Sequence, residues 1–258
     1  MTWNRLIDCH YTVFILLESQ CRFGLTCFPL RHYHVQMDFL IEPLLDEQML
    51  QAFRSTLLQY EDLWQSGAAT AGWHARIVKN NRQLSQQCEP YQQLSKQLIQ
   101  VLSQNPLVCC LAFPHKIHSL LFTRTGPGEG YGRHVDSVRM AQGRSDLSFT
   151  VALSDPADYE GGDLVLENPF SQKRIRLAAG HAVVYPSTLL HQVDPVISGE
   201  RLVAVGWIQS RIRRDDQREL LFDLDTARRT QFKNHGKDEV FDLVTRSYNN
   251  LLRLWDQN

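Results

Sequence analysis

Two histidines and one aspartate in the second half of the chain have the types and spacing of metal ligands. His134 and Asp136 form a His-Val-Asp sequence, and His191 follows much later, after a Tyr-Pro-Ser-Thr segment. On an extended strand, residues two apart point to the same side, so this imidazole and carboxylate would face one way. Two imidazoles and one carboxylate occupy one face of an octahedral ion and leave three positions open. That is the geometry of a non-haem Fe(II) centre that reacts with dioxygen.

The surroundings of these residues strengthen the metal prediction. A His-x-Asp sequence alone is weak evidence, because it is equally typical of a surface turn. Here a glycine-rich turn, residues 126–130, precedes the pair, and alternating strand-like segments separate it from His191. A basic residue, Arg201, then follows within the next strand-like segment. We therefore favour a shared metal over a coincidence of sequence.

Arg201 is the fourth residue of this predicted site. It opens the apolar run 201–208, where an inward-facing guanidinium is costly unless a carboxylate meets it. Guanidinium groups form bidentate, charge-assisted hydrogen bonds with carboxylates. An exposed arginine at the start of the strand and an internal salt bridge are the simpler alternatives. Beside the metal ligands, we favour an external dicarboxylate such as 2-oxoglutarate, with its other end on the metal.

These residues resemble the Fe(II)/2-oxoglutarate-dependent dioxygenases, within them the prolyl-4-hydroxylase-like group, and most closely the bacterial PKHD-type hydroxylases. The resemblance extends from about Met37 to the C-terminus and is dense from Leu120 to Leu224. The matching segments are Tyr131-x-x-His134-x-Asp136, 144–155, 159–164, 184–188, His191, Arg201 and 207–210.

The resemblance implies an oxidoreductase with Fe(2+) held by His134, Asp136 and His191 and with 2-oxoglutarate bound by Arg201. Such an enzyme couples the oxidative decarboxylation of 2-oxoglutarate to succinate with hydroxylation of a second substrate by dioxygen. The group is also described as using L-ascorbate (vitamin C), which would keep the iron reduced. Kinship with prolyl hydroxylases suggests a peptidyl or amino-acid substrate, but kinship of fold does not fix the substrate.

Three further residues are weaker candidates for the site. Tyr131 lies three residues before His134, close enough to touch cosubstrate or substrate, and packing is an equal alternative. Thr150 and Trp207 are pocket candidates in two of the strand-like segments.

Two rival functions remain open at this point. One is a jelly-roll enzyme that uses another divalent metal without 2-oxoglutarate. The other is a jelly-roll metal-binding or scaffold module without oxygenase activity. Arg201 argues against the first and the complete ligand set against the second.

The pattern beyond Lys116 predicts a mixed, mainly β fold. Many short antiparallel strands with tight turns are typical of a double-stranded β-helix, or jelly roll, whose open end gathers residues from several strands. Gly161-Gly162 marks a turn or bulge. The expected strands are 118–125, 146–153, 163–167, 174–177, 181–185, 192–197 and 202–208.

Apolar residues at helical spacing predict flanking helices. The first runs from about Leu44 to Trp64, with Asp46 as N-cap and Gly67 as its stop. The others are 91–105, 211–224 and 225–255. The C-terminal helices would pack on the barrel or mediate homo-oligomerisation. The expected division is 1–36 as extension, 37–115 as helical support region, 116–210 as jelly-roll core and 211–258 as helical tail.

Residues 1–36 differ from the rest in composition. They hold three of the six cysteines, and the family resemblance begins only at Met37. We expect Met37 to be the natural start and the preceding residues to be non-native; a real but disordered extension is the alternative. Their apolar run is too short to span a bilayer, and no signal-peptide cleavage site follows it.

The composition predicts an ordinary enzyme of the cytoplasm. The chain has 258 residues, a formal net charge of −1 and 21% charged residues, which gives no reason to expect nucleic acid or a membrane as partner. The cysteine spacing forms no disulfide framework, so we expect a reducing compartment, which also suits ferrous iron.

Overall fold

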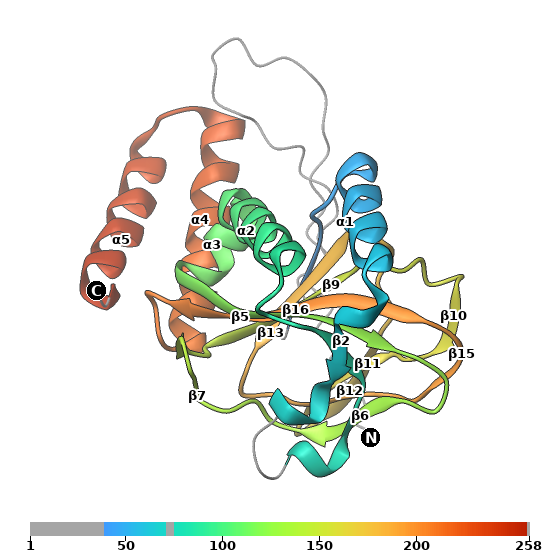
Figure 1. Ribbon diagram of the computed structural model, residues 1–258. Coiled ribbons are helices and arrows are strands. Elements are labelled where there is room, and N and C mark those ends of the chain that lie inside the picture. The colour runs from blue at the N-terminus through green and yellow to red at the C-terminus, as the bar shows by residue number, and fades with distance from the viewer. Residues whose placement is uncertain (1–38, 71–74, 257–258) are drawn as a thin grey trace, which may run out of the picture.

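The structure, a computed structural model, describes residues 39–70 and 75–256. Two antiparallel sheets face each other, and helices cover the outer face of the larger sheet (Figure 1). This is the expected jelly-roll core with flanking helices. The expected extension, residues 1–36, lies outside the described part of the chain.

The larger sheet has seven strands, and those at its centre are almost entirely buried. In spatial order they are β1 (Leu40–Pro43), β13 (His181–Pro186), β9 (Leu147–Ala152), β16 (Arg201–Ser210), β5 (Pro114–Thr125), β4 (Arg82–Leu84) and β2 (Trp64–Ser66). The smaller sheet runs β12 (Ser171–Ile175), β11 (Leu164–Asn168), β14 (Leu190–Val193), β6 (Gly130–His134) and β3 (Lys79–Asn80). Two further pairs form separate two-stranded sheets: β10 (Tyr159–Gly161) with β15 (Val196–Gly199), and β7 (Arg139–Met140) with β8 (Gly143–Arg144).

The alternation of side chains along the central strands separates a helix-facing core from a cavity. On β9, Phe149 and Val151 belong to the core under the helices, while Ser148 and Thr150 line the cavity between the sheets. This follows from the two-residue period of a strand. Small polar side chains therefore face inward where a site can form.

Three helices seal the outer face of the larger sheet: α1 (Glu47–Gln59), α2 (Glu89–Gln104) and α3 (Pro106–Ala112). Asp46 caps α1 by accepting a 2.8 Å hydrogen bond from the Met49 amide, as expected. Phe53 of α1 and Tyr91 of α2 each meet the ring of Phe122 edge-on, at 6.2 and 6.0 Å between centroids. Burial of these apolar faces fixes the sheet that carries the site.

The C-terminal helices α4 (Asp215–His235) and α5 (Glu239–Trp255) form an antiparallel pair beside α3 (Figure 1). Gly236, with φ at +72°, ends α4, and Asp238 caps α5. Tyr248 and Leu221 belong to a small apolar core between the two helices. The tail thus packs on the rest of the protein.

Several expected boundaries are wrong. The first helix ends at Gln59 instead of near Gly67, because residues 64–66 pair with β4 at the edge of the sheet. The expected strand 192–197 is two strands, β14 and β15, because Pro195 between them cannot donate a backbone hydrogen bond. The helix expected to end at Leu224 continues to His235.

The region expected as helical support, residues 37–115, also supplies four short strands, β1 to β4. β3 and β4 are separated only by Asn81, yet they belong to different sheets. Strands of two or three residues carry too little hydrophobic periodicity to stand out in sequence. Their presence brings Lys79 and Gln83 beside the cavity.

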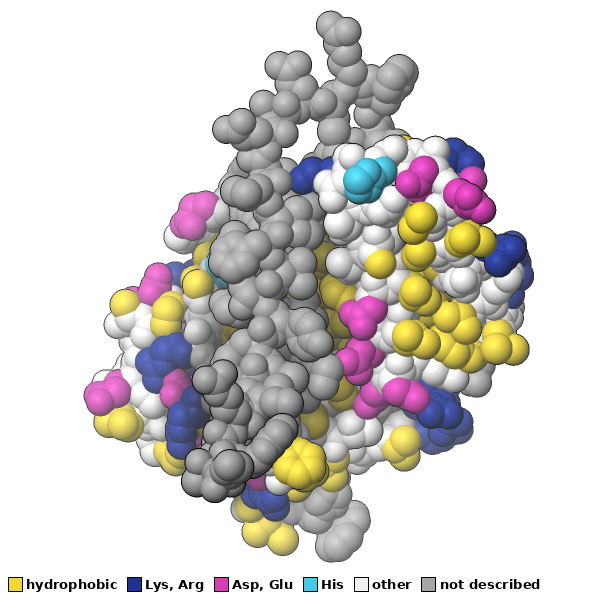
Figure 2. All heavy atoms as spheres, turned by 180° about the vertical axis from the view of Figure 1, so that it is seen from behind, with side chains coloured by type: hydrophobic (Ala, Val, Ile, Leu, Met, Phe, Trp, Pro, Cys, Tyr) yellow, Lys and Arg dark blue, Asp and Glu magenta, His cyan; other side chains and the backbone are white. Residues whose placement is uncertain are grey.

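The surface carries no dominant charge on the side viewed in Figure 2. Among the described residues shown there, basic and acidic side chains are interspersed around hydrophobic ones (Figure 2). Within the described residues, no helix is both long and apolar enough to cross a membrane.

Candidate metal centre

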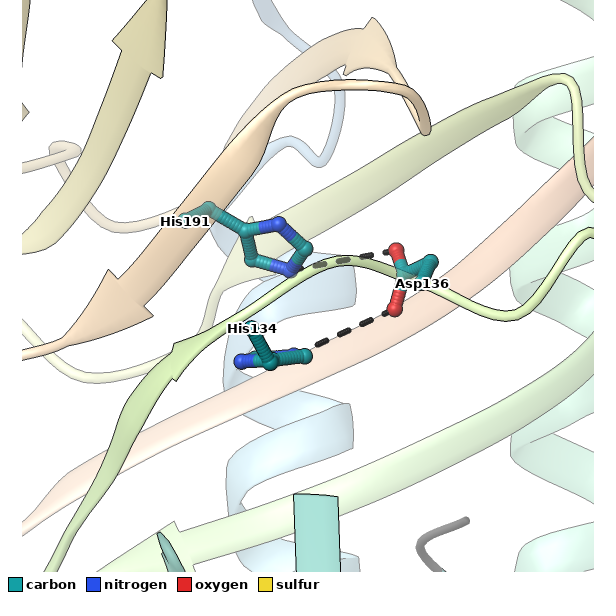
Figure 3. Close-up of side chains that lie close together, drawn as sticks. All are labelled: His134, Asp136 and His191. Carbon is teal, nitrogen blue, oxygen red and sulfur yellow. Dashed lines mark ion pairs between the residues drawn. The ribbon is translucent and has the colours of Figure 1, made fainter. Parts of the chain in front are cut away.

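His134, Asp136 and His191 converge at the open end of the sandwich (Figure 3). His134 is the last residue of β6 and pairs directly with His191 of β14, so the two imidazoles lie side by side with ring centroids 4.2 Å apart. The chain then leaves the strand, and Asp136 returns toward both rings. One potential ligand atom from each residue lies within 4.8 Å of the others.

Backbone carbonyls orient both imidazoles. Nδ1 of His134 lies 2.8 Å from the carbonyl oxygen of Gly132, and Nδ1 of His191 lies 3.1 Å from that of Leu189. A proton on each Nδ1 donates to the carbonyl and leaves the Nε2 lone pair free. The two Nε2 atoms lie 4.0 and 3.8 Å from the Asp136 carboxylate. The three donors therefore face a common point.

Burial keeps His134 in the neutral form that can bind a metal. Its side chain is buried, and this desolvation, aided by the neighbouring His191, lowers its pKa to about 4. At neutral pH the imidazole is uncharged, so it binds a cation without first losing a proton.

Ser148 holds the carboxylate from the opposite sheet, and Ser187 contacts Ser148. The Ser148 hydroxyl on β9 donates a 2.6 Å hydrogen bond to Oδ2 of Asp136 and lies 2.7 Å from the Ser187 hydroxyl. Asp136 follows β6 of the smaller sheet, so this bond crosses the sandwich. It limits rotation of the carboxylate and leaves its other oxygen available.

The donor set fits a divalent iron ion. Two imidazoles and one carboxylate on one side of a point leave the other side open for further ligands, which is the facial arrangement of non-haem Fe(II) sites. A closed structural site would supply a fourth protein ligand. Among the described residues no other group of three such side chains is close enough to hold an ion.

A cavity of about 280 Å³ adjoins the three residues and extends between the two sheets. Its volume is near the lower end for small-molecule sites. Polar or charged groups at several points of its wall can fix the orientation of a ligand. They include Tyr131, Thr150, Tyr185, Arg201, Trp207 and Lys79. The sequence-predicted pocket candidates therefore all line one space.

Arg201, the first residue of β16, is 6% exposed and lines this cavity. Burial lowers its pKa, and the neighbouring Tyr159 opposes that shift. No carboxylate of the described residues lies within ion-pair distance of Arg201, so the internal salt bridge considered from sequence is not seen there. Gly162, with φ at +67°, makes room for its side chain: a Cβ there would lie 3.0 Å from Cδ of Arg201.

Tyr131 stacks on a predicted metal ligand. Its ring lies 3.7 Å from the His134 ring, centroid to centroid, with 21° between the planes. Burial raises the pKa of its hydroxyl, so Tyr131 stays protonated at neutral pH. Packing against the His134 imidazole is thus one role of Tyr131, whether or not it also touches cosubstrate or substrate.

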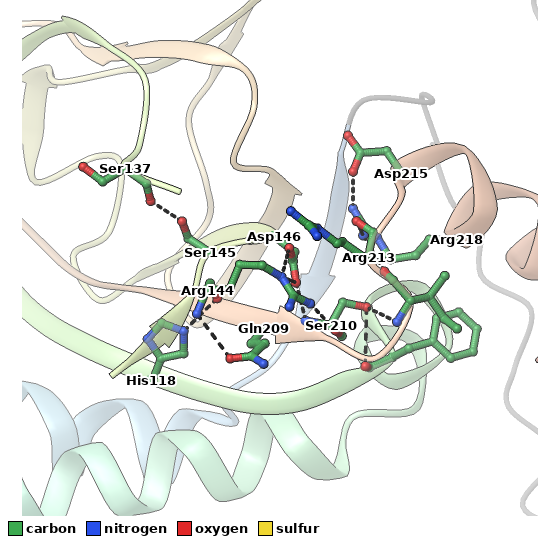
Figure 4. Close-up of polar contacts among 12 residues, drawn as sticks. His118, Ser137, Arg144, Ser145, Asp146, Gln209, Ser210, Arg213, Asp215 and Arg218 are labelled. Carbon is green, nitrogen blue, oxygen red and sulfur yellow. Dashed lines mark hydrogen bonds and ion pairs between the residues drawn. The ribbon is translucent and has the colours of Figure 1, made fainter. Parts of the chain in front are cut away.

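A polar network braces the segment that follows Asp136 (Figure 4). Arg144 binds the carboxylate of Asp146 at 2.7 Å and the carbonyl of Ser210 at 2.9 Å. His118, which is buried, places Nε2 3.0 Å from the Arg144 carbonyl. The network ties this segment to the ends of β5 and β16. His118 thus has a structural role.

No role for Lys79, Gln83 or Ser148 was predicted from the sequence. Lys79 reaches the cavity because β3 pairs with β6, which places it opposite Tyr131. Ser148 meets Asp136 only across the sandwich. One feature of the sequence could have identified Ser148. It lies two residues before Thr150 on an alternating strand, so both side chains face inward.

Comparisons with known proteins agree with this geometry. Residues 120–209 match the model of the 2OG-Fe(II) oxygenase superfamily, and residues 215–257 match the PKHD-type hydroxylase C-terminal domain. A PKHD-type hydroxylase of Prochlorococcus marinus (strain MIT 9313) is 46% identical over 217 residues, which cover 84% of this chain and 98% of that protein. One of Picosynechococcus sp. (strain ATCC 27264 / PCC 7002 / PR-6) is 47% identical over 221 residues, 86% of this chain and all of that protein.

Solved structures share the fold at low sequence identity. A prolyl hydroxylase from Trichoplax adhaerens, in complex with a hypoxia inducible factor peptide fragment, has a TM-score of 0.51 and 16% identity. The match covers 72% of this chain and 87% of that one. The α-ketoglutarate-dependent carbocyclase SnoK from nogalamycin biosynthesis has a TM-score of 0.52 and 14% identity, covering 67% and 80% of the two chains.

Proposed function

Because this chain belongs to the PKHD-type hydroxylases of the 2OG-Fe(II) oxygenase superfamily, we propose that His134, Asp136 and His191 hold its Fe(II) and that Arg201 binds its 2-oxoglutarate. The family establishes an Fe(II)- and 2-oxoglutarate-dependent hydroxylase that uses dioxygen and releases succinate. The assignment of these roles to four particular residues is our inference. It is supported above all by the convergence of three metal-binding side chains beside a buried, unpaired guanidinium.

Bound Fe(II) supplies the redox chemistry that couples decarboxylation of 2-oxoglutarate to hydroxylation. The protein's own part is to orient groups and exclude water. His134 and His191 present Nε2 because backbone carbonyls take the other ring proton. Ser148 holds Oδ2 of Asp136, and the carboxylate then faces His134 with Oδ1 and His191 with Oδ2.

Arg201 is suited to the distal carboxylate of 2-oxoglutarate. A guanidinium can form two parallel hydrogen bonds with a carboxylate, and here no described acid competes for them. In a buried setting, the gain from pairing this charge favours a dicarboxylate over a monocarboxylate. Tyr159 beside the guanidinium helps to fix its direction.

Thr150, Trp207 and Tyr131 complete the wall around this space. We assign to Tyr131 the positioning of the His134 ring, since the two rings stack. The wall leaves the metal centre open on the cavity side, where cosubstrate and substrate must meet.

We propose three further features of the function. Ascorbate as a reductant for the iron is supported by the resemblance alone. A cytoplasmic location is supported by the free thiols of Cys88, Cys109 and Cys110, which suit a reducing compartment. Homo-oligomerisation through the tail is supported by exposed Val240 and Leu243 on α5.

Dioxygen uptake and succinate release, measured with and without 2-oxoglutarate, test the proposed function. The wild-type chain with Fe(II) should consume dioxygen and release succinate only when 2-oxoglutarate is present. Uptake that is independent of 2-oxoglutarate would favour another metalloenzyme. If added Fe(II) changes neither the melting temperature nor turnover, a scaffold is the better explanation.

A further inference from the structure

Two buried cations reach the cavity from opposite sheets, and the proposed function uses only one. Arg201 enters from β16 of the larger sheet and is assigned to 2-oxoglutarate. Lys79 enters from β3, the edge strand of the smaller sheet, and is 9% exposed. A buried ammonium is costly to desolvate, so a second buried positive charge calls for its own partner.

Lys79 forms no ion pair among the described residues, although the charge of Asp136 acts on it from beyond ion-pair distance. Its Nζ lies 3.0 Å from the hydroxyl of Thr70 and 5.2 Å from the centroid of the Tyr131 ring. An ammonium has three N–H donors, and these contacts engage one of them by a hydrogen bond. By contrast, the buried Arg124 binds Glu61 and Glu200, and the buried Arg218 binds Asp215.

Gln83 adds a second donor at the same corner. Its Oε1 accepts a 2.7 Å hydrogen bond from Thr70, which links it to Lys79. Its Nε2 is buried and has no hydrogen-bond partner among the described residues. Gln83 belongs to β4 of the larger sheet, so β3 and β4 together bring an ammonium and an amide to the cavity wall.

We propose that Lys79 and Gln83 bind a carboxylate of the primary substrate. This inference rests on the proposed function, because it takes Arg201 as the partner of 2-oxoglutarate. One ammonium accompanied by neutral donors matches a single negative charge, as on an amino acid, a free peptide C-terminus or an acidic side chain. The substrate class is therefore a carboxylate-bearing amino acid or peptide.

The contacts of Tyr131 relate this subsite to the metal centre. The same ring lies under the Lys79 ammonium and stacks on the imidazole of His134. A carboxylate at Lys79 is thus one side chain away from the metal ligands. The carbon to be hydroxylated must then be separated from that carboxylate by several bonds, not adjacent to it.

Calorimetric titration of the full chain, loaded with Mn(II) and 2-oxoglutarate under argon, tests the subsite. The probes are N-acetylated L-amino acids, each as free acid and as C-terminal amide. An additional N-acetylglutamate α-amide and N-acetylglutamine α-amide pair differs only in the side-chain carboxylate. In one or both sets of probes, the wild type should bind the acid at least tenfold more tightly than the matched amide. The set of probes that shows the larger preference identifies whether the subsite binds the α-carboxylate or the side-chain carboxylate.

Lys79→Met should abolish this acid preference, and Lys79→Arg should retain part of it. Lys96→Met is the matched control, because Lys96 is an exposed lysine on α2, remote from the cavity lining. Gln83→Leu should reduce the preference without removing the charge. Since Lys79 forms no ion pair among the described residues, Lys79→Met should not lower the melting temperature, so loss of fold does not mimic loss of binding.

Equal binding of acids and amides by the wild type would overturn the inference, as would an acid preference that survives in Lys79→Met. The same conclusion holds if no acid binds, or if Lys79→Met weakens 2-oxoglutarate as much as it weakens the acids. Failure of the proposed function looks different: the wild type would bind neither Mn(II) nor 2-oxoglutarate. In that case the preference for acids over amides can still be measured by the same titration without Mn(II) and 2-oxoglutarate.

Discussion

The hydroxyl of Ser148 donates a 2.6 Å hydrogen bond to the carboxylate of Asp136, and this bond links the two sheets at the metal centre. Asp136 lies just beyond β6, outside the regular hydrogen bonding of its strand. Its orientation therefore depends on a residue of the opposite sheet. The same serine also contacts the Ser187 hydroxyl, which can orient the Ser148 hydroxyl that holds the carboxylate.

Ser148→Ala should weaken metal binding while preserving the fold. Loss of a partner that orients a ligand typically costs about 10- to 100-fold in metal affinity or activity. Titration with Mn(II) measures the change, and Ser55→Ala, an exposed serine on α1, is the control. Unchanged affinity in Ser148→Ala would show that Asp136 does not need this bond.

Arg201→Leu should mainly raise the requirement for 2-oxoglutarate. Hydrogen bonds to charged groups contribute about 1.5–3 kcal/mol each, so the KM for 2-oxoglutarate should rise by at least about tenfold. Metal affinity should change far less, because Arg201 is not among the three proposed ligands. Succinate release measured over a range of 2-oxoglutarate concentrations separates the two effects. A KM equal to that of the wild type would remove Arg201 from the cosubstrate site.

Gly162→Ala should impair 2-oxoglutarate binding through Arg201. The backbone at Gly162 has φ at +67°, and an added Cβ would lie 3.0 Å from Cδ of Arg201. Gly128→Ala is the matched control, since Gly128 has φ at +76° but nothing within 4 Å of an added Cβ. Both substitutions should cost about 1–2 kcal/mol of stability in the left-handed region. Only Gly162→Ala should also raise the KM for 2-oxoglutarate; equal KM values in the two variants would contradict this.

The unpaired state of Lys79 predicts a pH dependence of stability. Burial lowers the pKa of Lys79 from 10.5 to about 8, and the charge of Asp136 opposes that shift. Between these pH values the unfolded chain binds a proton that the folded chain does not, so stability rises with pH through this window. The penalty is fully present below pH 8.

Urea unfolding of the metal-free wild type and of Lys79→Met measures this effect. The stability of the wild type relative to Lys79→Met should increase by up to about 3 kcal/mol between pH 8 and 10.5. Tyr131 and His134 also lie near the Lys79 ammonium. Both residues are present in the wild type and in Lys79→Met, so the comparison isolates the effect of Lys79. A constant difference across this range would mean that the Lys79 ammonium is compensated in the folded chain.

The parts of the fold that sequence could predict are those with local patterns. The alternation in residues 146–153 predicted β9, and the side chain of Asp46 predicted the N-cap of α1. The His-Val-Asp spacing likewise brought His134 and Asp136 to one side. These signals depend on neighbours within a few residues.

The remainder depends on contacts between distant segments. Lys79 became a site candidate only because a two-residue strand pairs with Tyr131. Residues 64–66 left the expected helix because β4 offers a sheet edge to pair with. Neither event leaves a periodic signal in the local sequence, since tertiary pairing overrides helix propensity.

Anaerobic titration with Fe(II) in the presence of 2-oxoglutarate tests the central claim most directly. The variants are His191→Ala and His181→Ala; both histidines contact a backbone carbonyl through Nδ1, but only His191 faces Asp136. The wild type and His181→Ala should each bind one Fe(II) per chain, and His191→Ala should bind it at least about 100-fold more weakly, because loss of a residue that merely orients a ligand already costs about 10- to 100-fold. Equal Fe(II) binding by His191→Ala and the wild type would contradict the proposed iron centre.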